Sequence, residues 1–451
     1  MNHKERLSKV IPGGAHTYSR GTDQYPANAP SILQRGKGAY VWDPDGNRYL
    51  DYGMALRAVT LGYAHPEVNA AAIREIESGN NLTRASVTEL QAAELLVDLI
   101  PSADMVKFAK NGSNVTTAAT KIARAFNGKR YICVPKQQPF FSFDDWFIGT
   151  TPMNRGVPEN YFGNTLLFDY GDISSLERHF ENHPEQIAGV MLEPATTLTP
   201  CPQECGRILS YHTPCSGCPR RENGFLHAVQ RLCRREGALF ILDEMITGFR
   251  WHLQGAQTYF GLEPDMTTFG KGMANGFSVA ALVGRRDVMD VAGIDKQGSE
   301  RTFLLSTTHG GEMSGLGAFI ETVRIYKEQD ACRHFWLYGR RLREGLNGLA
   351  QEFGIAEHFL IDGPDISLNY VTRDKTGAMS LPLRTLFSQE MIRRGVLMPW
   401  IAVSLAHGDE ELDMTISAAK RALEIYRRAL DEGVERYLEG PVIKPVFRKF
   451  N

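Results

Sequence analysis

The feature that most constrains the fold of this chain is a repeated order of helical segments and short apolar runs between residues 87 and 325. Residues 88–99 and 115–126 have the apolar spacing of helices, and an apolar run of four or five residues follows each. Such unbroken runs are typical of strands in a sheet that is covered on both faces. The order predicts an α/β domain with a mostly parallel sheet. Strands are expected at residues 105–109, 131–134, 188–192, 239–242, 267–269 and 279–283.

The two ends of the chain have another pattern. Residues 39–42 and 48–51 are strand-like runs joined around Asp45-Gly46, which predicts a tight hairpin. After residue 326, helical periodicity at 331–353 and 410–430 encloses candidate strands at 367–371 and 396–399. We therefore expect an N-terminal segment (1–86) that belongs to a small domain or a dimer contact, a large domain (87–325), and a small α+β domain (326–451).

The composition is that of an ordinary globular protein. Hydrophobic residues make up 43% of the 451 residues, charged residues 23%, and the net charge is −2. This balance disfavours a disordered chain and a polybasic nucleic-acid-binding surface. The first eleven residues lack the apolar core of a signal peptide, and no later apolar run approaches the roughly 20 residues of a membrane span. The expected location is the cytoplasm.

Two segments that follow predicted strands carry candidate catalytic residues. Asp243 comes directly after the strand at 239–242, where an acid in an open α/β sheet meets a ligand. A helix cap or an ion pair would also explain it. Lys271 lies among glycines after the strand at 267–269, and a partly desolvated lysine attacks carbonyls to form an imine. A surface lysine in a turn is the alternative.

Two further loops contain groups suited to phosphate. Asn111-Gly112-Ser113 ends a predicted strand and opens a helix, whose free N–H groups favour an anion. The hydroxyl-rich loop 306–311, with Thr308, precedes the helix expected near residue 312. Ordinary turns use the same residue types. A lysine, a carboxylate, a phosphate cup and an aromatic lid are together the parts that pyridoxal 5′-phosphate requires.

On these residues the chain resembles the class III, fold type I aminotransferases, and most of all their glutamate-1-semialdehyde aminomutase branch. The similarity runs from Pro12 to about Arg427. Its most specific part is Leu-Asp-Glu-Met-Ile-Thr-Gly-Phe-Arg at 242–250, followed by Gly270-Lys271 at the family's spacing. The resemblance implies the fold type I architecture of pyridoxal-phosphate-dependent transferases, with a large domain and a small α+β domain formed by both chain ends.

The resemblance also implies roles for individual residues. Lys271 would form the Schiff base with the cofactor and move a proton, and Asp243 would hold the pyridine nitrogen protonated. A threonine at the position of Thr308 reaches the phosphate from the other subunit, which implies a homodimer. The other implied cofactor contacts are Asn111, Gly112 and Ser113 at the phosphate, Met245 under the ring, Phe140 stacked on it, and Glu193 in a Glu-Pro motif.

The substrate end of the site is expected to differ from that of common relatives. Arg20 matches the arginine that holds the substrate carboxylate in the semialdehyde enzyme, and Thr17 matches a nearby serine; an arginine fork suits a carboxylate or a phosphate. Phe140-Phe141-Ser142 replaces the family's Tyr-His-Gly, so the phenol is absent. Residues 399–403 lack the arginine that many class III enzymes use for an α-carboxylate.

The resulting hypothesis is an aminotransferase that moves an amino group from a donor to an aldehyde or ketone, such as a sugar-like or other biosynthetic intermediate. One alternative is an aminomutase that keeps donor and acceptor in one molecule. The other is a catalytically quiet scaffold that binds the cofactor, which retention of both Asp243 and Lys271 disfavours.

An insert at residues 199–222 is not predicted by the family pattern. It contains Cys201, Cys205, Cys215 and Cys218, spaced as two close pairs in a Pro- and Gly-rich segment. Four thiolates surround Zn²⁺ tetrahedrally, and a metal can order a loop that has too few apolar residues to fold alone. An iron–sulfur cluster, redox-active thiols and unliganded thiols are the alternatives.

Overall fold

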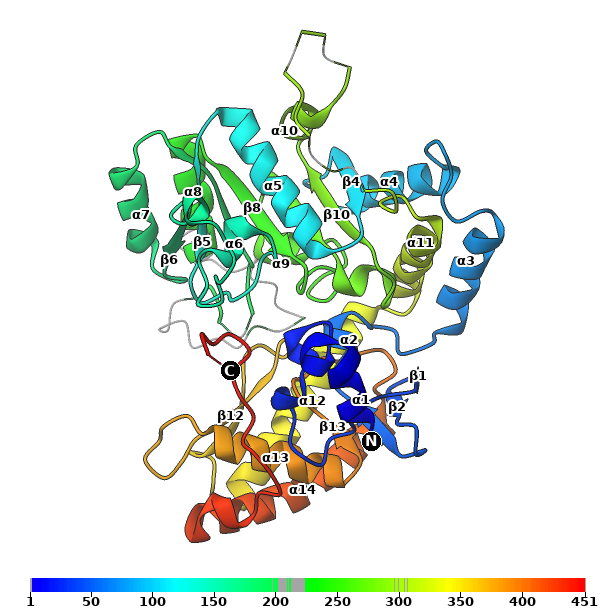
Figure 1. Cartoon of the computed structure of the whole chain (residues 1–451), viewed down its shortest axis with the longest axis vertical. Helices are drawn as coiled ribbons and strands as arrows, with labels where there is room; N and C mark the ends of the chain where they lie inside the picture. The colour runs from blue at the N-terminus through cyan, green and yellow to red at the C-terminus, as the bar shows by residue number, and fades with distance from the viewer. Residues whose placement is uncertain are drawn as a thin grey trace. The chain divides into compact units, whose positions relative to one another are not determined.

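The computed structural model describes residues 2–196, 198–201, 209, 211, 224–295, 297–298, 300–303, 305 and 307–450. The chain divides into two compact units, coloured along the sequence in Figure 1. Unit 1 joins Met1–His65 to His334–Arg448, and unit 2 is built from Pro66–Arg333 with the last few residues of the chain. The three-part division expected from the sequence, with boundaries at residues 87 and 326, stays a proposal.

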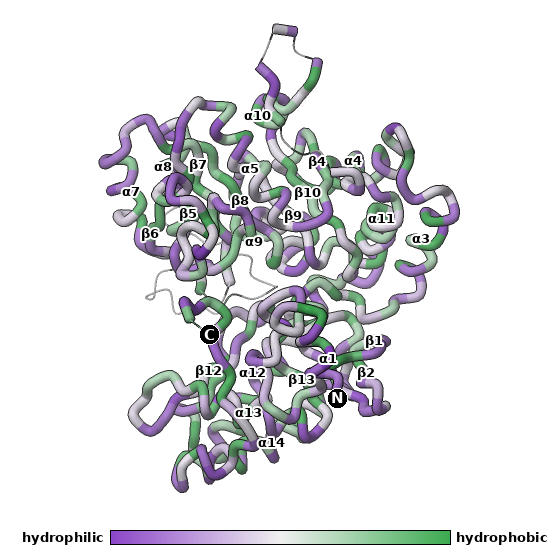
Figure 2. Tube along the Cα trace, in the orientation of Figure 1, coloured by the Kyte–Doolittle hydropathy of each residue, from purple (hydrophilic) through white to green (hydrophobic). Residues whose placement is uncertain are grey.

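Unit 2 contains a seven-stranded sheet in the order β4-β10-β9-β8-β7-β5-β6. Strand β10 is antiparallel to both of its neighbours, and the remaining pairs are parallel, which confirms the mostly parallel sheet. Every residue of β7 to β10 is buried, as expected for strands covered on both faces, and their segments are mostly green in Figure 2. The strands are β4 (Met105–Ala109), β5 (Tyr131–Pro135), β6 (Thr165–Phe168), β7 (Ile187–Leu192), β8 (Leu239–Glu244), β9 (Met266–Phe269) and β10 (Ala280–Gly284).

The central helix of unit 2, α5 (Gly112–Asn127), packs across β4, β10, β9, β8 and β7. It begins at Asn111, whose side chain caps the N–H of Asn114, and ends at Gly128, whose φ of 71° is the left-handed conformation of a C-terminal cap. Its small and apolar face belongs to the main core cluster. The other helices of unit 2 are α3 (Pro66–Glu77), α4 (Val87–Leu99), α6 (Asp145–Ile148), α7 (Ile173–Asn182), α8 (Phe225–Glu236), α9 (Ala256–Phe260), α10 (Arg286–Met289) and α11 (Met313–Glu328).

Unit 1 has a four-stranded sheet in the order β1-β2-β3-β13 and a separate pair, β11-β12. The predicted hairpin is confirmed, because β2 and β3 pair antiparallel across Asp45-Gly46. The Asp43 carboxylate stabilises this turn by accepting the N–H groups of Asp45 and Asn47. The elements are α1 (His3–Val10), β1 (Arg35–Lys37), β2 (Tyr40–Trp42), β3 (Arg48–Asp51), α2 (Met54–Arg57), β11 (Phe359–Asp362), β12 (Asn369–Thr372), α13 (Leu381–Arg393), β13 (Val396–Leu397) and α14 (Asp409–Glu432).

Helix α12 (Ala331–Glu352) supplies most of its length to unit 1. At Gly339 this helix lies so close to the main chain of Asp365 that an added Cβ would be 1.8 Å from the Asp365 carbonyl oxygen. The buried Asp365 carboxylate forms ion pairs with Arg340 and Arg343 of the same helix. Among the described residues, no helix is long and apolar enough to cross a membrane.

Candidate active site

The candidate residues of unit 2 gather at one edge of its sheet. Strand register puts Asp243 beside Thr268, and Phe269 beside Ala281 on the other side. The next pairing, Ala280 with Ala109, brings the end of β4 to the same edge. Asp243 lies in β8, next to its last residue, and the segments that leave β4, β7 and β9 carry Asn111–Ser113, Glu193 and Lys271. These candidates, far apart in sequence, therefore meet at the carboxyl ends of the strands.

Asp243 is a buried carboxylate with one oxygen committed to the protein. Its side chain is 2% exposed, and Oδ1 accepts hydrogen bonds from the Met245 N–H (2.9 Å) and the Thr268 hydroxyl (3.1 Å). Within the described part of the chain both bonds go to Oδ1, so Oδ2 remains available to a ligand donor. Burial raises the pKa of Asp243, while the Met245 bond, the charge of Lys271 and the Thr268 bond act in the opposite direction.

Lys271 begins the short 3-10 helix η8 (Lys271–Ala274), with a left-handed φ of 43°. This conformation is uncommon for a residue with a Cβ, and such outliers cluster at functional sites. The Lys271 charge lowers the pKa of Asp243, so the two groups lie close enough to interact. The structure therefore brings together the two residues that the sequence predicts as catalytic.

Met245 lies between the two glycine-containing loops. A Cβ at Gly112 would be 2.9 Å from its sulfur, and a Cβ at Gly270 would be 2.6 Å from it. Only glycine gives this close approach on both sides without displacing the thioether. Met245 is thus wedged between the start of α5 and the Lys271 loop.

The start of α5 is joined to the aromatic loop that follows β5. The Ser113 hydroxyl accepts the Phe143 N–H (3.1 Å), and the Thr116 hydroxyl donates to the Phe141 carbonyl (2.8 Å). Phe141 is buried and packs edge-on against Phe147, whereas Phe140 is 47% exposed. Phe140, which also packs edge-on against Phe147, is about half exposed in the loop that is joined to the start of α5, and Phe141 is a core residue.

Glu193, directly after β7, is buried and held by a side chain that the sequence analysis missed. The Gln138 amide oxygen accepts the Glu193 N–H (2.8 Å), and its nitrogen donates to the Glu193 carbonyl (2.7 Å). Gln138 is itself buried in the loop after β5. This two-bond clamp fixes the start of the Glu-Pro segment, and sequence alone offers no signal for it because the partners are 55 residues apart.

Thr308 is exposed, and the segment around it is tied to the start of α5. Asn81 donates to the Thr308 carbonyl (2.9 Å), and Asn80 donates to the Glu312 carboxylate (2.9 Å). Glu312 also pairs with Lys110, the residue before Asn111. Hydrogen bonds from Lys110 and Asn80 hold the pKa of Glu312 below its ordinary value despite partial burial. The two phosphate-suited loops of the sequence are thus mechanically connected.

Glu244, the acid next to Asp243, serves the fold. Its carboxylate accepts the N–H groups of Ala256 (2.5 Å) and Gln257 (3.0 Å) and the Thr247 hydroxyl (3.2 Å). Burial raises the pKa of Glu244 to about 7, although these bonds oppose the rise. Because successive side chains of a strand point to opposite faces, Asp243 faces the candidate catalytic residues and Glu244 faces the start of α9.

Arg20 and Thr17 belong to unit 1. Arg20 is exposed at the end of the 3-10 turn η2 (Tyr18–Arg20), and its N–H donates to the Thr17 carbonyl (2.9 Å). Burial and Asp51 raise the pKa of Tyr25 to about 12, and the Arg20 charge counteracts this rise, which places Arg20 near Tyr25. Residues 399–403 contain no arginine, as the sequence shows.

Most of the cysteine insert lies outside the described residues, including Cys205, Cys215 and Cys218. Cys201 is half-buried and lies near Tyr170, whose pKa is raised well above its ordinary value by burial first and by Cys201 second. Among the residues that the structure describes, no group of three or more His, Cys, Asp or Glu side chains is arranged to hold a metal ion.

Comparison with known proteins identifies the family. The family model described as "Aminotransferase class-III" matches residues 22–358, more than half of the chain. The chain belongs to the class III aminotransferases. A 3-aminobutyryl-CoA aminotransferase of Cloacimonas acidaminovorans is 29% identical over 436 residues, covering 95% of this chain and 98% of that protein.

Solved structures agree with this family assignment. The FumI protein of Sphingopyxis sp. MTA144, in its PLP internal aldimine form, is 27% identical with a TM-score of 0.82, covering 95% of this chain and 97% of that one. An omega-transaminase from Sphaerobacter thermophilus is 25% identical with a TM-score of 0.77, covering 94% and 97%. The class III membership, the fold type I architecture and the aminotransferase activity expected from the sequence are confirmed.

Proposed function

We propose that this aminotransferase uses pyridoxal 5′-phosphate, with Lys271 as its covalent anchor and Asp243 as the partner of its ring nitrogen. The observation that carries the proposal is the buried Asp243 carboxylate, which has Oδ2 to spare and lies within electrostatic reach of Lys271. A cationic N–H opposite Oδ2 would offset the cost of burying that carboxylate. Matches to PLP-bound transaminases support the same cofactor.

When bound, the cofactor supplies the reactive carbonyl and an electron-accepting ring, and the chain's own residues do the rest. Asp243 would hold a proton on the ring nitrogen and so keep the ring electron-withdrawing. The Lys271 amine would take the proton that leaves the substrate carbon and return it to another carbon as a general base and acid. Met245, held between Gly112 and Gly270, would support one face of the ring, and the N–H groups at Gly112 and Ser113 would hold the phosphate at the start of α5.

The test is spectroscopic. Protein loaded with pyridoxal phosphate and then freed of excess cofactor should be yellow, and Lys271→Ala should abolish the visible band because the covalent link is lost. Lys107→Ala, on an exposed position of β4, is the matched control and should keep the band. An unchanged band in Lys271→Ala would refute the anchor. An amino donor should bleach the band of the unmodified enzyme, whereas a quiet scaffold would not respond.

For the substrate, we propose an aldehyde or ketone whose carbonyl is not next to a free carboxylate. The absence of an arginine from residues 399–403 supports this class, as does the 3-aminobutyryl-CoA of the named relative, in which the amino group is on carbon 3. Sugar-like and other biosynthetic carbonyl compounds fall in the same class. Arg20 and Thr17 are proposed to bind an anionic group of the substrate. A panel of acceptors with and without an α-carboxylate tests this preference.

The aminotransferase assignment is favoured over the aminomutase alternative, because the matched family and the named relative are aminotransferases. The specific likeness to the semialdehyde aminomutase branch stays a prediction. Glutamate labelled with ¹⁵N separates the two activities. Label transferred to a second molecule supports the aminotransferase, and isomerisation without transfer would overturn it.

We further propose a homodimer in which Thr308 contributes to the partner's site. Five large apolar side chains are exposed on α3, on α4 and between them, and the intervening Asn81 binds the Thr308 segment. These exposed apolar side chains support a subunit contact at α3 and α4. They are Ile73, Ile76, Leu82, Val87 and Leu90. Light scattering after gel filtration tests the dimer, and mixing Lys271→Ala with Thr308→Ala protein should restore activity if the sites are shared.

Two proposals from the sequence need their own experiments. A structural Zn²⁺ at Cys201, Cys205, Cys215 and Cys218 rests on their spacing, and elemental analysis of anaerobically purified protein without stoichiometric zinc or iron would defeat it. A cytoplasmic location is supported by Cys133, Cys233 and Cys332, which are buried and not disulfide-bonded. Fractionation of the producing cells tests that location.

A further inference from the structure

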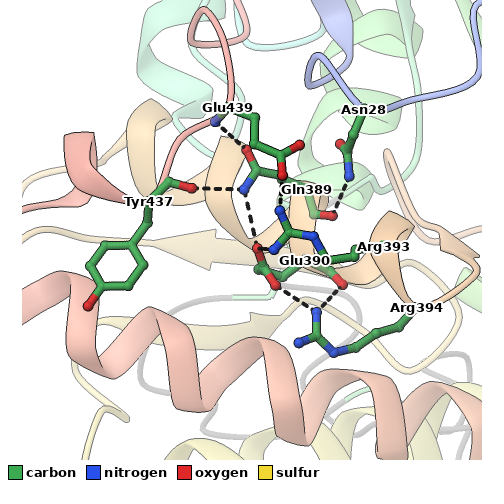
Figure 3. Close-up of polar contacts among 7 residues, drawn as sticks. All are labelled: Asn28, Gln389, Glu390, Arg393, Arg394, Tyr437 and Glu439. Carbon is green, nitrogen blue, oxygen red and sulfur yellow. Dashed lines mark hydrogen bonds and ion pairs between the residues drawn. The ribbon is translucent and has the colours of Figure 1, made fainter.

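The chain beyond α14 returns along unit 1 and is fastened by side chains of α13. Figure 3 shows the centre of this contact, where the Gln389 side chain lies between Tyr437 and Glu439. The Gln389 amide nitrogen donates to the Tyr437 carbonyl (2.9 Å), and its oxygen accepts the Glu439 N–H (2.9 Å). One amide thus pairs with the main chain of the tail as a strand partner would.

The neighbouring residue, Glu390, adds buried ion pairs beside this contact. Its carboxylate is 1% exposed and pairs with Arg393 and Arg394, and Arg393 also pairs with Glu439 of the tail. On the other side, Asn28 donates to the Gln389 carbonyl (2.9 Å). The same turn of α13 therefore holds the C-terminal tail and the N-terminal segment together (Figure 3).

Further along, the tail contacts the N-terminal segment directly. An added Cβ at Gly440 would lie 2.5 Å from the Cβ of Ala27, so the tail and the N-terminal segment are in contact there. The Lys444 N–H donates to the Asp23 carbonyl (2.9 Å), and the Arg448 guanidinium pairs with the Asp23 carboxylate (2.5 Å). Burial acts to raise the pKa of Asp23, yet bonds from Gln24 and Arg448 outweigh it and hold the pKa below its ordinary value.

Asp23 lies close to Arg20 along the chain. The two residues belong to consecutive 3-10 turns, η2 (Tyr18–Arg20) and η3 (Thr22–Gln24), joined at Gly21. The Gly21 N–H donates to the Tyr18 carbonyl (2.9 Å), and an added Cβ at Gly21 would lie 2.8 Å from the Asp23 carboxylate. A displacement of Asp23 would therefore shift the turn that directly follows Arg20 and Gly21.

We propose that the tail, residues 434–448, is a strap that positions the Arg20 turn and thereby sets the preference for an anionic substrate. This inference rests on the proposed role of Arg20. Arg448 and Asp23 act as positioning residues, and Gln389 anchors the strap. Arg20 is exposed and its turn has few buried contacts of its own, so without the strap the guanidinium would sample several positions and lose binding free energy to ordering.

The experiment compares Arg448→Gln and Asp23→Asn with Arg436→Gln, an exposed arginine of the same tail, as the matched control. Either strap variant should raise KM for an anionic substrate about tenfold, as expected for loss of about 1.4 kcal/mol, and leave kcat nearly unchanged. KM for an amine donor without an anionic group should stay as in the unmodified enzyme. The visible cofactor band should also be unchanged. Hydrogen exchange at residues 17–24 should become faster in both strap variants and not in the control.

A double variant with the two charges exchanged distinguishes loss of the ion pair from misfolding. Asp23→Lys combined with Arg448→Glu should restore KM, since the ion pair is rebuilt with reversed polarity. If Arg20→Gln raises KM while both strap variants leave it unchanged, the strap is refuted and the role of Arg20 stands. If Arg20→Gln also leaves KM unchanged, the proposed role of Arg20 fails and the strap's effect on specificity fails with it.

Discussion

Exchanging Glu244 for glutamine tests how this residue, which follows Asp243 at the end of β8, contributes to the stability of the fold. The carboxylate is fully buried and accepts two main-chain N–H groups at the start of α9 and the hydroxyl of Thr247, just after β8. Burial still raises its pKa from 4.5 to about 7. The folded protein therefore keeps a proton on Glu244 between pH 4.5 and 7, where the unfolded chain has lost it.

The sign follows from proton binding. Because the folded state binds more protons than the unfolded state in this interval, the free energy of unfolding falls as pH rises from 4.5 to 7 and is level above 7. The interval, at about 1.4 kcal/mol per pH unit, amounts to about 3 kcal/mol for this group. Glutamine does not titrate, so Glu244→Gln removes that contribution. It also puts an NH₂ where an N–H donor points, which costs about 1–3 kcal/mol at every pH.

Urea unfolding of both proteins, with saturating pyridoxal phosphate, between pH 4.5 and 8 gives the comparison. The unmodified enzyme should be the more stable at pH 4.5, and its advantage should shrink by about 3 kcal/mol by pH 8. Glu181→Gln, at an exposed position of α7, is the control and should follow the unmodified curve. A stability difference that does not vary with pH would refute the reasoning, because Glu244 would then bind as many protons in the folded state as in the unfolded state.

The remaining predictions concern close contacts and one ion pair. Gly339→Ala should severely destabilise unit 1, since its Cβ would overlap the Asp365 carbonyl, whereas Gly348→Ala on the same helix meets open space and should stabilise it by about 1 kcal/mol in urea unfolding. Lys110→Met and Glu312→Gln should each weaken binding of pyridoxal phosphate, measured by titration of the visible band. The double variant should be no weaker than either single one, because the two residues act as one pair.

The sequence predicts the large sheet well because its signal is local. Runs such as 239–242 and 188–192 are apolar without interruption, and the structure buries every residue of both strands. Strand β6 was missed, since Thr165–Phe168 has only four residues, of which Leu167 is exposed. Helix α13 was missed for a related reason: it is buried nearly all round, so its apolar residues form no stripe.

In the candidate site, too, the residues that follow predicted strands could be predicted, and those held by distant contacts could not. Asp243 and Lys271 each follow a strand that the sequence predicts, so their meeting at one sheet edge follows from the fold class. Gln138 could not be found in this way, because its clamp on Glu193 depends on two loops meeting across β5 and β7. The sequence assigns a role to Asp243 alone, and the task of Glu244 at the start of α9 is found only in the structure.

The contacts that sequence reasoning misses are the ones that control geometry. The tail and the Arg20 turn are joined by Arg448 and Asp23, which are 425 residues apart in the chain. No periodicity or motif reports such a pair, since each member is an ordinary surface charge until the fold brings them together. A motif can therefore identify the groups that do the chemistry, while the precision with which a substrate is held depends on pairings that only the folded chain shows. Specificity should accordingly change through such distant pairs, with the residues of the motif left intact.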